Sequence, residues 1–213
     1  MKLKGVAATL KKENIDQKCN LSKRVIFFAT GNFNKFREAK EILNRNKFAT
    51  AMIRFKGVEI QSESLEEIAR TAVKNAFSKT SLPVFVEDAG LFIEALDGFP
   101  GPYAAYVYKT VHNKGILKLM SEVSERQAKF RSVIAYQDQY LAEPKCFLGE
   151  SKGKITKNER MEKGKSGFGF DPIFQPDGND KTFAEMTVDE KNSYSHRATA
   201  VQKLAEWLDQ RQG

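Results

Sequence analysis

The chain is organised around residues 84–108, which read VFVEDAGLFIEALDGFPGPYAAYVY. The first three residues of this stretch are apolar, which predicts a buried strand. Two carboxylates, Glu87 and Asp88, follow where that strand is expected to end. Neighbouring strand residues point to opposite faces, so both carboxylates reach one site only if the chain turns at Ala89-Gly90. Ligands of open α/β sheets bind beyond the carboxyl ends of strands, which makes this pair a candidate metal ligand and general base.

A surface acidic turn is the plainer interpretation of an isolated Glu-Asp pair. The residues that follow favour the functional interpretation, because Gly90 comes soon after the pair and Gly98 and Gly101 flank Pro100. Such glycines mark backbone positions that need special dihedral angles or a close approach of another group.

The bulk properties indicate a single soluble unit. A length of 213 residues fits one large domain or two small lobes that share a sheet, and 41% hydrophobic residues suffice for a packed core. No apolar run approaches the roughly 20 residues of a membrane span, and the N-terminus has no apolar signal core. Cys19 and Cys146 form no C-x-x-C pair, which favours reduced thiols and argues against zinc. We therefore expect a cytoplasmic protein with no membrane partner.

The net charge of +8 has two interpretations. It describes a solvated, lysine-rich surface, or it attracts an anionic ligand, which would be nucleic acid or a nucleotide polyphosphate. Residues 1–22 are polar and lysine-rich, and we expect them to be an extension outside a single two-lobed domain over residues 23–213.

The domain is expected to begin with a strand, a glycine turn and a helix. The apolar run 24–29 predicts the strand, Thr30-Gly31-Asn32 the turn, and residues 34–44 the helix. This order presents backbone N–H groups to a phosphate at the helix N-terminus. Lys35 in the first turn is slightly unfavourable for the helix dipole, which suggests that an anion compensates it.

The rest of the chain continues the alternation of helices and strands. Ser64 and Glu67 form a capping-box pattern at the start of a core helix, and Ser195 is a plausible N-cap for the last one. The other expected elements are a strand at 51–55, a helix at 115–123, a strand at 129–136 paired with 145–148, a charged irregular segment at 151–163, and a helix at 195–210.

A second group of residues near the C-terminus suits a flat, polar ligand. Residues 164–174 read GKSGFGFDPIF, and aromatic rings on a glycine-rich frame are well suited to stacking on a base. Lys191, His196 and Arg197 then place three donors close together at the start of the last helix.

At these segments the chain resembles the inosine triphosphate pyrophosphatases, also called non-canonical purine NTP pyrophosphatases, and its archaeal members most. The segments are Thr30-Gly31-Asn32 with Lys35 and Glu38; Glu87-Asp88-Ala89-Gly90-Leu91 through Gly98-Phe99-Pro100-Gly101; Gly167-Phe168-Gly169-Phe170-Asp171-Pro172; and Glu190-Lys191-Asn192 with Ser195-His196-Arg197.

The resemblance implies a mixed α/β fold with an elongated central sheet flanked by helices, and two lobes with a nucleotide cleft between them. It implies a homodimer that uses Mg²⁺ to split ITP, dITP and XTP into the monophosphate and pyrophosphate. By motif position, it implies phosphate binding by Thr30, Gly31, Asn32 and Lys35; Mg²⁺ binding by Glu59, Glu87 and Asp88; general-base catalysis by Asp88; and base recognition by Phe168, Gly169, Asp171, Lys191, His196 and Arg197.

Two positions depart from the pattern, because many relatives have serine at Ala104 and glycine at His112. Two alternatives also remain. One is a nucleotide pyrophosphatase for a different base, and the other is a basic nucleic-acid-binding module. Glu87 and Asp88 argue against the second, since carboxylates beside a phosphate path repel it unless a metal is bound. We therefore expect a purine nucleoside triphosphate as the partner and no nucleic acid.

Overall fold

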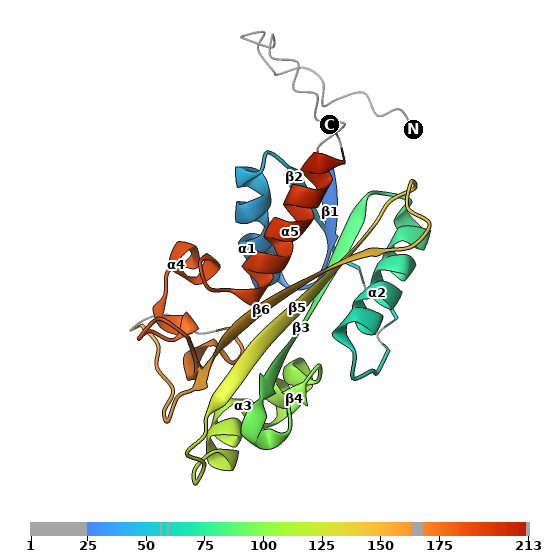
Figure 1. Cartoon of the computed structure of the whole chain (residues 1–213). Coiled ribbons are helices and arrows are strands. Elements are labelled where there is room, and N and C mark those ends of the chain that lie inside the picture. The colour runs from blue at the N-terminus through green and yellow to red at the C-terminus, as the bar shows by residue number, and fades with distance from the viewer. Residues whose placement is uncertain (1–24, 56, 59, 163–167, 212–213) are drawn as a thin grey trace, which may run out of the picture.

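The structure is a computed structural model that describes residues 25–55, 57–58, 60–162 and 168–211 (Figure 1). The predictions made for residues 1–22 and for Glu59 lie outside this part of the chain. The strands are β1 Val25–Ala29, β2 Ala49–Ile53, β3 Val84–Ile93, β4 Pro100–Gly101, β5 Gln127–Gln137, β6 Lys145–Ile155 and β7 Phe174–Pro176. The helices are α1 Phe33–Arg45, α2 Leu65–Thr80, α3 Ala104–Leu119, α4 Val188–Asn192 and α5 His196–Gln210.

A seven-stranded mixed sheet forms the centre of the fold, in the order β2-β1-β3-β5-β6-β7, with β4 added to β3. β1 runs parallel to β2 and β3, whereas β3, β5, β6 and β7 are successively antiparallel. α1 and α5 lie on one face and α2 on the other, and the long strands continue past them to α3 and β4 (Figure 1). This confirms the predicted mixed α/β class with an elongated sheet flanked by helices.

The sheet carries separate hydrophobic cores towards its two ends. Near β1, residues such as Phe28 and Phe85 pack against α1 and α5, and α2 covers the opposite face. Farther along the strands, Leu91 and Ile93 of β3 pack against α3 and against the aromatic segments that follow β6. These cores define the two lobes.

The central strand β3 differs from its prediction. It runs unbroken through Ala89-Gly90, so the turn expected after Asp88 is wrong. Gly90 serves a close approach instead, because a Cβ atom there would lie 2.5 Å from the carbonyl oxygen of Gly101 in β4. Gly98 and Gly101 do take the positive φ angles expected of them, +86° and +58°.

Two helix or strand boundaries and one helix cap also differ. α3 begins at Ala104 rather than at residue 115, with an interruption at His112, whose φ of 56° is rare for a residue other than glycine. β6 continues to Ile155, so residues 151–155 are not irregular. Ser64 caps α2 by accepting from the N–H of Glu67 at 3.3 Å, but the Glu67 carboxylate accepts from Ser62 Oγ instead of closing the capping box.

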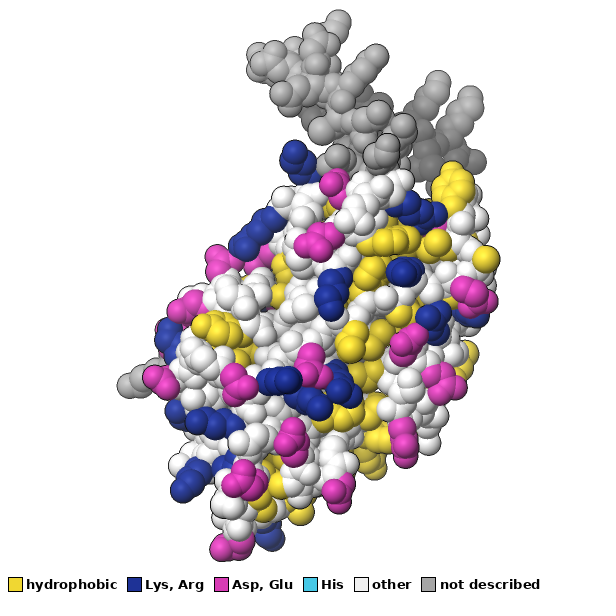
Figure 2. Space-filling model, viewed as in Figure 1, with side chains coloured by type: hydrophobic (Ala, Val, Ile, Leu, Met, Phe, Trp, Pro, Cys, Tyr) yellow, Lys and Arg dark blue, Asp and Glu magenta, His cyan; other side chains and the backbone are white. Residues whose placement is uncertain are grey.

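No helix in the described ranges combines the length and the apolar character needed to cross a bilayer. On the face shown in Figure 2, Lys and Arg side chains are interspersed with Asp and Glu side chains.

Candidate active site

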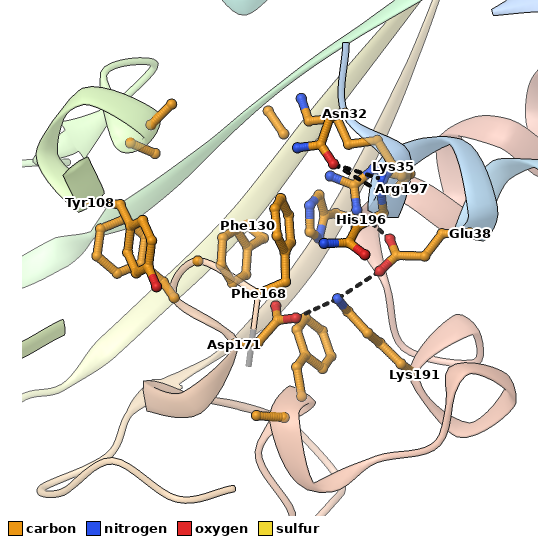
Figure 3. A pocket seen from close by; sticks show the side chains of 18 of the residues that line it. Asn32, Lys35, Glu38, Tyr108, Phe130, Phe168, Asp171, Lys191, His196 and Arg197 are labelled. Atoms are coloured by element: carbon orange, nitrogen blue, oxygen red, sulfur yellow. Dashed lines mark hydrogen bonds and ion pairs between the residues drawn. The ribbon is translucent and has the colours of Figure 1, made fainter. Parts of the chain in front are cut away.

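A cleft of about 850 Å³ lies at the carboxyl end of β1, between the two lobes (Figure 3). From β1 the chain passes to β2 on one side and β3 on the other, and open α/β sheets bind ligands at such a switch point. β3 pairs with β1 only at its residues Val84 and Phe85, and it pairs with β4 at Leu91 and Phe92. Among the described residues, the edge of β3 between these contacts has no strand partner, and the cleft runs along it. Its volume suits a small-molecule ligand.

The N-terminus of α1 borders one end of the cleft. Thr30 Oγ1 accepts from the N–H of Asn32 at 3.1 Å, and Asn32 Oδ1 accepts from the N–H groups of Asn34 and Lys35 at 3.0 and 3.2 Å. Asn32 and Lys35 line the cleft, whereas Thr30 stabilises the turn. Gly31 is exposed, and a Cβ atom there would meet nothing within 4 Å. Packing of the chain therefore does not require glycine at this position.

A buried carboxylate on α1, Glu38, connects two cationic residues of the C-terminal segment (Figure 3). It accepts from Lys191 Nζ at 2.9 Å and forms a short contact with Nη1 of Arg197. Lys191 also pairs with Asp171 at 2.6 Å. The structure thus brings together Asp171, Lys191 and Arg197, which are predicted to recognise the base, and it adds Glu38 as the common partner of the two cations.

A second buried carboxylate, Glu87, compensates Lys35. Its Oε2 lies 2.8 Å from Lys35 Nζ, and its Oε1 accepts from Arg197 Nε at 3.1 Å and from Ser132 Oγ at 2.6 Å. The anion expected near Lys35 is therefore present within the protein. The Glu87 side chain is 1% exposed, so all of these contacts are shielded from solvent.

The ion pairs set the charge states of these buried groups. Burial alone would raise the pKa of Glu38, but Arg197 and Lys191 lower it to about 2. Burial likewise opposes ionisation of Glu87, and Arg197 and Lys35 nevertheless hold its pKa well below the ordinary value. Burial disfavours the charged form of Arg197, yet Glu87 and Glu38 raise its pKa. Both carboxylates and the guanidinium are therefore charged at neutral pH.

These pKa shifts predict a loss of stability in acid. The folded pKa of Glu38, about 2, is below its ordinary 4.5, so its contribution is complete above pH 4.5 and disappears as the pH falls towards 2. The difference corresponds to about 3 kcal/mol. Urea unfolding from pH 7 to pH 3 should show about 2 kcal/mol of this loss, because pH 3 still lies above the folded pKa, and Glu38→Gln should reduce the slope over the acid range. An equal slope in the two proteins would contradict this assignment.

Asp88 occupies a different position from Glu87. Because β3 is extended at both residues, the two side chains leave opposite faces of the sheet, and the structure does not bring both carboxylates to one site. Asp88 lines the cleft together with Ala89. Glu87 instead faces Lys35 and Arg197. The two carboxylates diverge because β3 stays extended through both of them. Gly90, which was expected to allow a turn, instead allows the close contact with β4.

The residues predicted to bind Mg²⁺ fit it only in part. Glu59 lies outside the described residues, and both oxygens of Glu87 already face cations. Within the described ranges, no group of three or more His, Cys, Asp or Glu side chains is arranged around a metal position. Asp88 does fit, since Mg²⁺ at nucleotide sites binds through one or two carboxylates together with substrate phosphates.

The other end of the cleft is aromatic. His196 stacks on Phe130 with their ring centroids 4.7 Å apart and their planes 12° apart. Phe168 and Gly169 line the same region, and Gly169 has a φ of +57° that suits glycine (Figure 3). Burial, reinforced by Arg197, holds the pKa of His196 well below 6.5, so its ring is neutral. Its Nδ1 atom has no hydrogen-bond partner among the described residues.

Some site residues were missed from the sequence. Phe130 and Ser132 lie on the inner face of β5, where strand alternation alone could have placed them without indicating a role. Tyr108 lines the cleft from α3 and contacts Phe170 edge-on, with ring centroids 5.5 Å apart. Glu38 belonged to the first motif but was given no role, although it precedes the buried Ile42 by four residues on the apolar face of α1.

Comparisons with known proteins identify the family of this chain. The sequence model of the Ham1 family matches residues 26–207 of this chain. A "dITP/XTP pyrophosphatase" from Methanopyrus kandleri is 48% identical over 182 residues, which is 85% of this chain and 95% of the relative. A protein of the same name from Thermococcus kodakarensis is 46% identical, over 85% and 95% of the two chains.

Solved structures show the same fold. The Ham1 protein of Staphylococcus aureus superimposes with a TM-score of 0.75 at 28% identity, and the alignment covers 88% of this chain and 99% of that one. A HAM1 protein from Coxiella burnetii gives a TM-score of 0.76 at 28% identity, over 87% and 98% of the chains. The sequence match spans both lobes and the cleft, and this chain belongs to the Ham1 family.

Proposed function

We propose that this protein hydrolyses the deaminated purine nucleotides ITP, dITP and XTP to the nucleoside monophosphate and pyrophosphate. Relatives named dITP/XTP pyrophosphatase, 41–48% identical to this chain, support this activity. The observation that carries the proposal is the polarity of the cleft. A helix N-terminus with Lys35 borders one end, and stacked rings with cationic donors border the other.

The α1 end suits the triphosphate. Lys35 is 19% exposed at its side chain and keeps donor capacity beyond its contacts with Glu87. The helix N-terminus contributes a positive dipole, and Gly31 leaves room for a phosphate to approach the backbone. Thr30 and Asn32 hold this turn in shape.

The aromatic end suits a 6-keto purine. Phe168 offers a face for stacking, and Lys191 and Arg197 are donor-only groups. Lys191 directs two of its three N–H groups to Glu38 and Asp171, so a donor remains for the keto oxygen. Adenine carries an amino group at ring position 6 in place of the keto oxygen, so a hydrogen-bond donor of the base would face a donor of the protein in a buried site.

Asp88 is the proposed general base. It lines the cleft where β3 lacks a strand partner among the described residues, between the phosphate end and the base end. A carboxylate there removes the proton from the water that attacks phosphorus. Bound Mg²⁺ would neutralise triphosphate charge, and Asp88, together with Glu59, is proposed to hold it.

The proposal includes a homodimer. Large apolar side chains are exposed near β4 and along α3, at Tyr106 (69%), Val111 (45%), Tyr103 (43%) and Phe99 (41%). Burying such a cluster against a second copy would remove it from water.

Base choice tests the proposed function. We expect kcat/KM for ITP to exceed that for ATP at least about a hundredfold, because the polar mismatch at position 6 leaves donors unpaired. The measurement is phosphate formation in the presence of Mg²⁺ and added inorganic pyrophosphatase, which converts released pyrophosphate to phosphate. ITP and ATP are assayed side by side. Equal rates would remove the base-recognition role from Lys191, His196 and Arg197. Absence of turnover together with salt-sensitive DNA binding would favour a nucleic-acid-binding module.

A further inference from the structure

The buried carboxylate of Glu87 joins a cation of α1 to a cation of α5 beside the cleft. One of its oxygens faces Lys35 at 2.8 Å, and the other accepts from Arg197 Nε at 3.1 Å. Lys35 also donates to the backbone carbonyl of Glu87 at 3.3 Å. Lys35 belongs to α1, which is proposed to bind the triphosphate, whereas Arg197 belongs to α5, whose first residues are proposed to recognise the base. A single side chain in the middle of β3 therefore fixes the separation of these two cations.

Ser132 fixes this carboxylate in turn. It lies on β5 opposite Ala89, so its side chain shares a sheet face with that of Glu87. Its Oγ donates to Oε1 of Glu87 at 2.6 Å, and the residue is fully buried. A neutral donor on the oxygen that also faces Arg197 keeps the carboxylate in one orientation, with its other oxygen towards Lys35.

We propose that Ser132 is a positioning residue that acts through Glu87 to hold Lys35 and Arg197 at the separation required between the triphosphate and the base. The inference rests on the proposed function and deepens it. It also gives Glu87 a role other than the metal ligand that the family resemblance implies. A carboxylate whose oxygens already face two cations is a poor ligand for Mg²⁺, since the bound cations repel the ion.

The first test replaces the hydroxyl. Ser132→Ala removes the donor with the loss of one atom, and kcat/KM for ITP should fall about tenfold to a hundredfold, the usual effect of losing a hydrogen bond to a charged group. Ser132→Thr, which keeps the hydroxyl, should recover most of the loss. Ser151→Ala is the matched control, because Ser151 is a buried serine of the neighbouring strand β6 and bonds to none of these charged groups within the described ranges.

Calorimetry separates positioning from a general packing defect. For Ser132→Ala, the affinity for the non-hydrolysable α,β-methylene analogue of ITP should fall more than the affinity for pyrophosphate alone, because only the whole nucleotide spans both ends of the cleft. An equal loss for the two ligands would overturn the proposal, as would wild-type kcat/KM in Ser132→Ala.

The role of Glu87 is tested by a double-mutant cycle and by metal dependence. Adding Ser132→Ala to Glu87→Gln should cause no further loss, since the serine acts through the carboxylate. The half-saturating Mg²⁺ concentration should be the same in wild type, Ser132→Ala and Glu87→Gln. A tenfold rise in Glu87→Gln would restore the metal-ligand role and overturn the proposal. If Glu87→Gln does not fold, the Ser132 variants still decide. An active wild type with unaffected Ser132 variants refutes this inference alone, whereas an inactive wild type refutes the proposed function with it.

Discussion

Replacing Asp88 with asparagine is expected to lower kcat for ITP by about 10²–10⁴ while leaving the fold intact, because that is the usual contribution of a general base. Asp88 lines the cleft along the edge of β3 that no described strand covers, whereas Glu87 on the same strand is enclosed by cations. Asparagine matches the shape of aspartate but cannot accept the proton from water. The measurement is steady-state kcat alongside circular dichroism and the thermal midpoint.

Glu94→Gln provides the control for this variant. Glu94 is an exposed carboxylate that directly follows the same strand, and its neutralisation changes the net charge by the same amount. It should keep wild-type kcat. If folded Asp88→Asn also keeps wild-type kcat, the catalytic base lies elsewhere.

Arg197→Ala is expected to lower the free energy of unfolding by about 3–5 kcal/mol, the usual effect of removing one partner from a buried ion pair. The Arg197 side chain is 3% exposed and contacts both Glu38 and Glu87. Its removal leaves both carboxylates buried with less compensation. The stability of Arg197→Ala therefore has to be measured first. Its kinetics report on base choice only if the variant is folded.

An exposed ion pair supplies the matched comparison. Arg45 lies 2.5 Å from Asp189, but their side chains are 61% and 73% exposed. Arg45→Ala should therefore cost less than about 1 kcal/mol. Urea denaturation at pH 7 measures both variants. Similar losses for the two arginines would show that the buried network does not stabilise the protein in the way described.

The sequence predicted elements well where a single local pattern determined them. The glycine turn and α1, the serine cap of α2 and the serine cap of α5 depend on neighbouring residues, and all three were located. β3 was predicted too short because its glycine serves a contact with β4, which is a tertiary feature. β6 was also predicted too short, since its outer lysines disguise the alternation of buried Ser151, Gly153 and Ile155.

In the candidate site, too, the sequence predicted local features and missed tertiary contacts. The sequence motifs identified residues that the structure brings to one cleft, including Lys35, Lys191 and Arg197. The contacts around them were not predictable, because Glu38 meets Lys191 and Arg197, and Ser132 meets Glu87, only after α1, α5 and β5 have packed together. The opposite orientations of Glu87 and Asp88 followed from strand geometry, but only once the strand was known to continue.

The proposed reaction in the cleft is cleavage of a deaminated purine triphosphate to the monophosphate and pyrophosphate. Phosphorus NMR of ITP incubated with the wild-type protein and Mg²⁺ tests it most directly, with a parallel sample in EDTA. We predict IMP and pyrophosphate as the first products, and no reaction in EDTA. IDP with inorganic phosphate, or unchanged ITP in the presence of Mg²⁺, would contradict the claim.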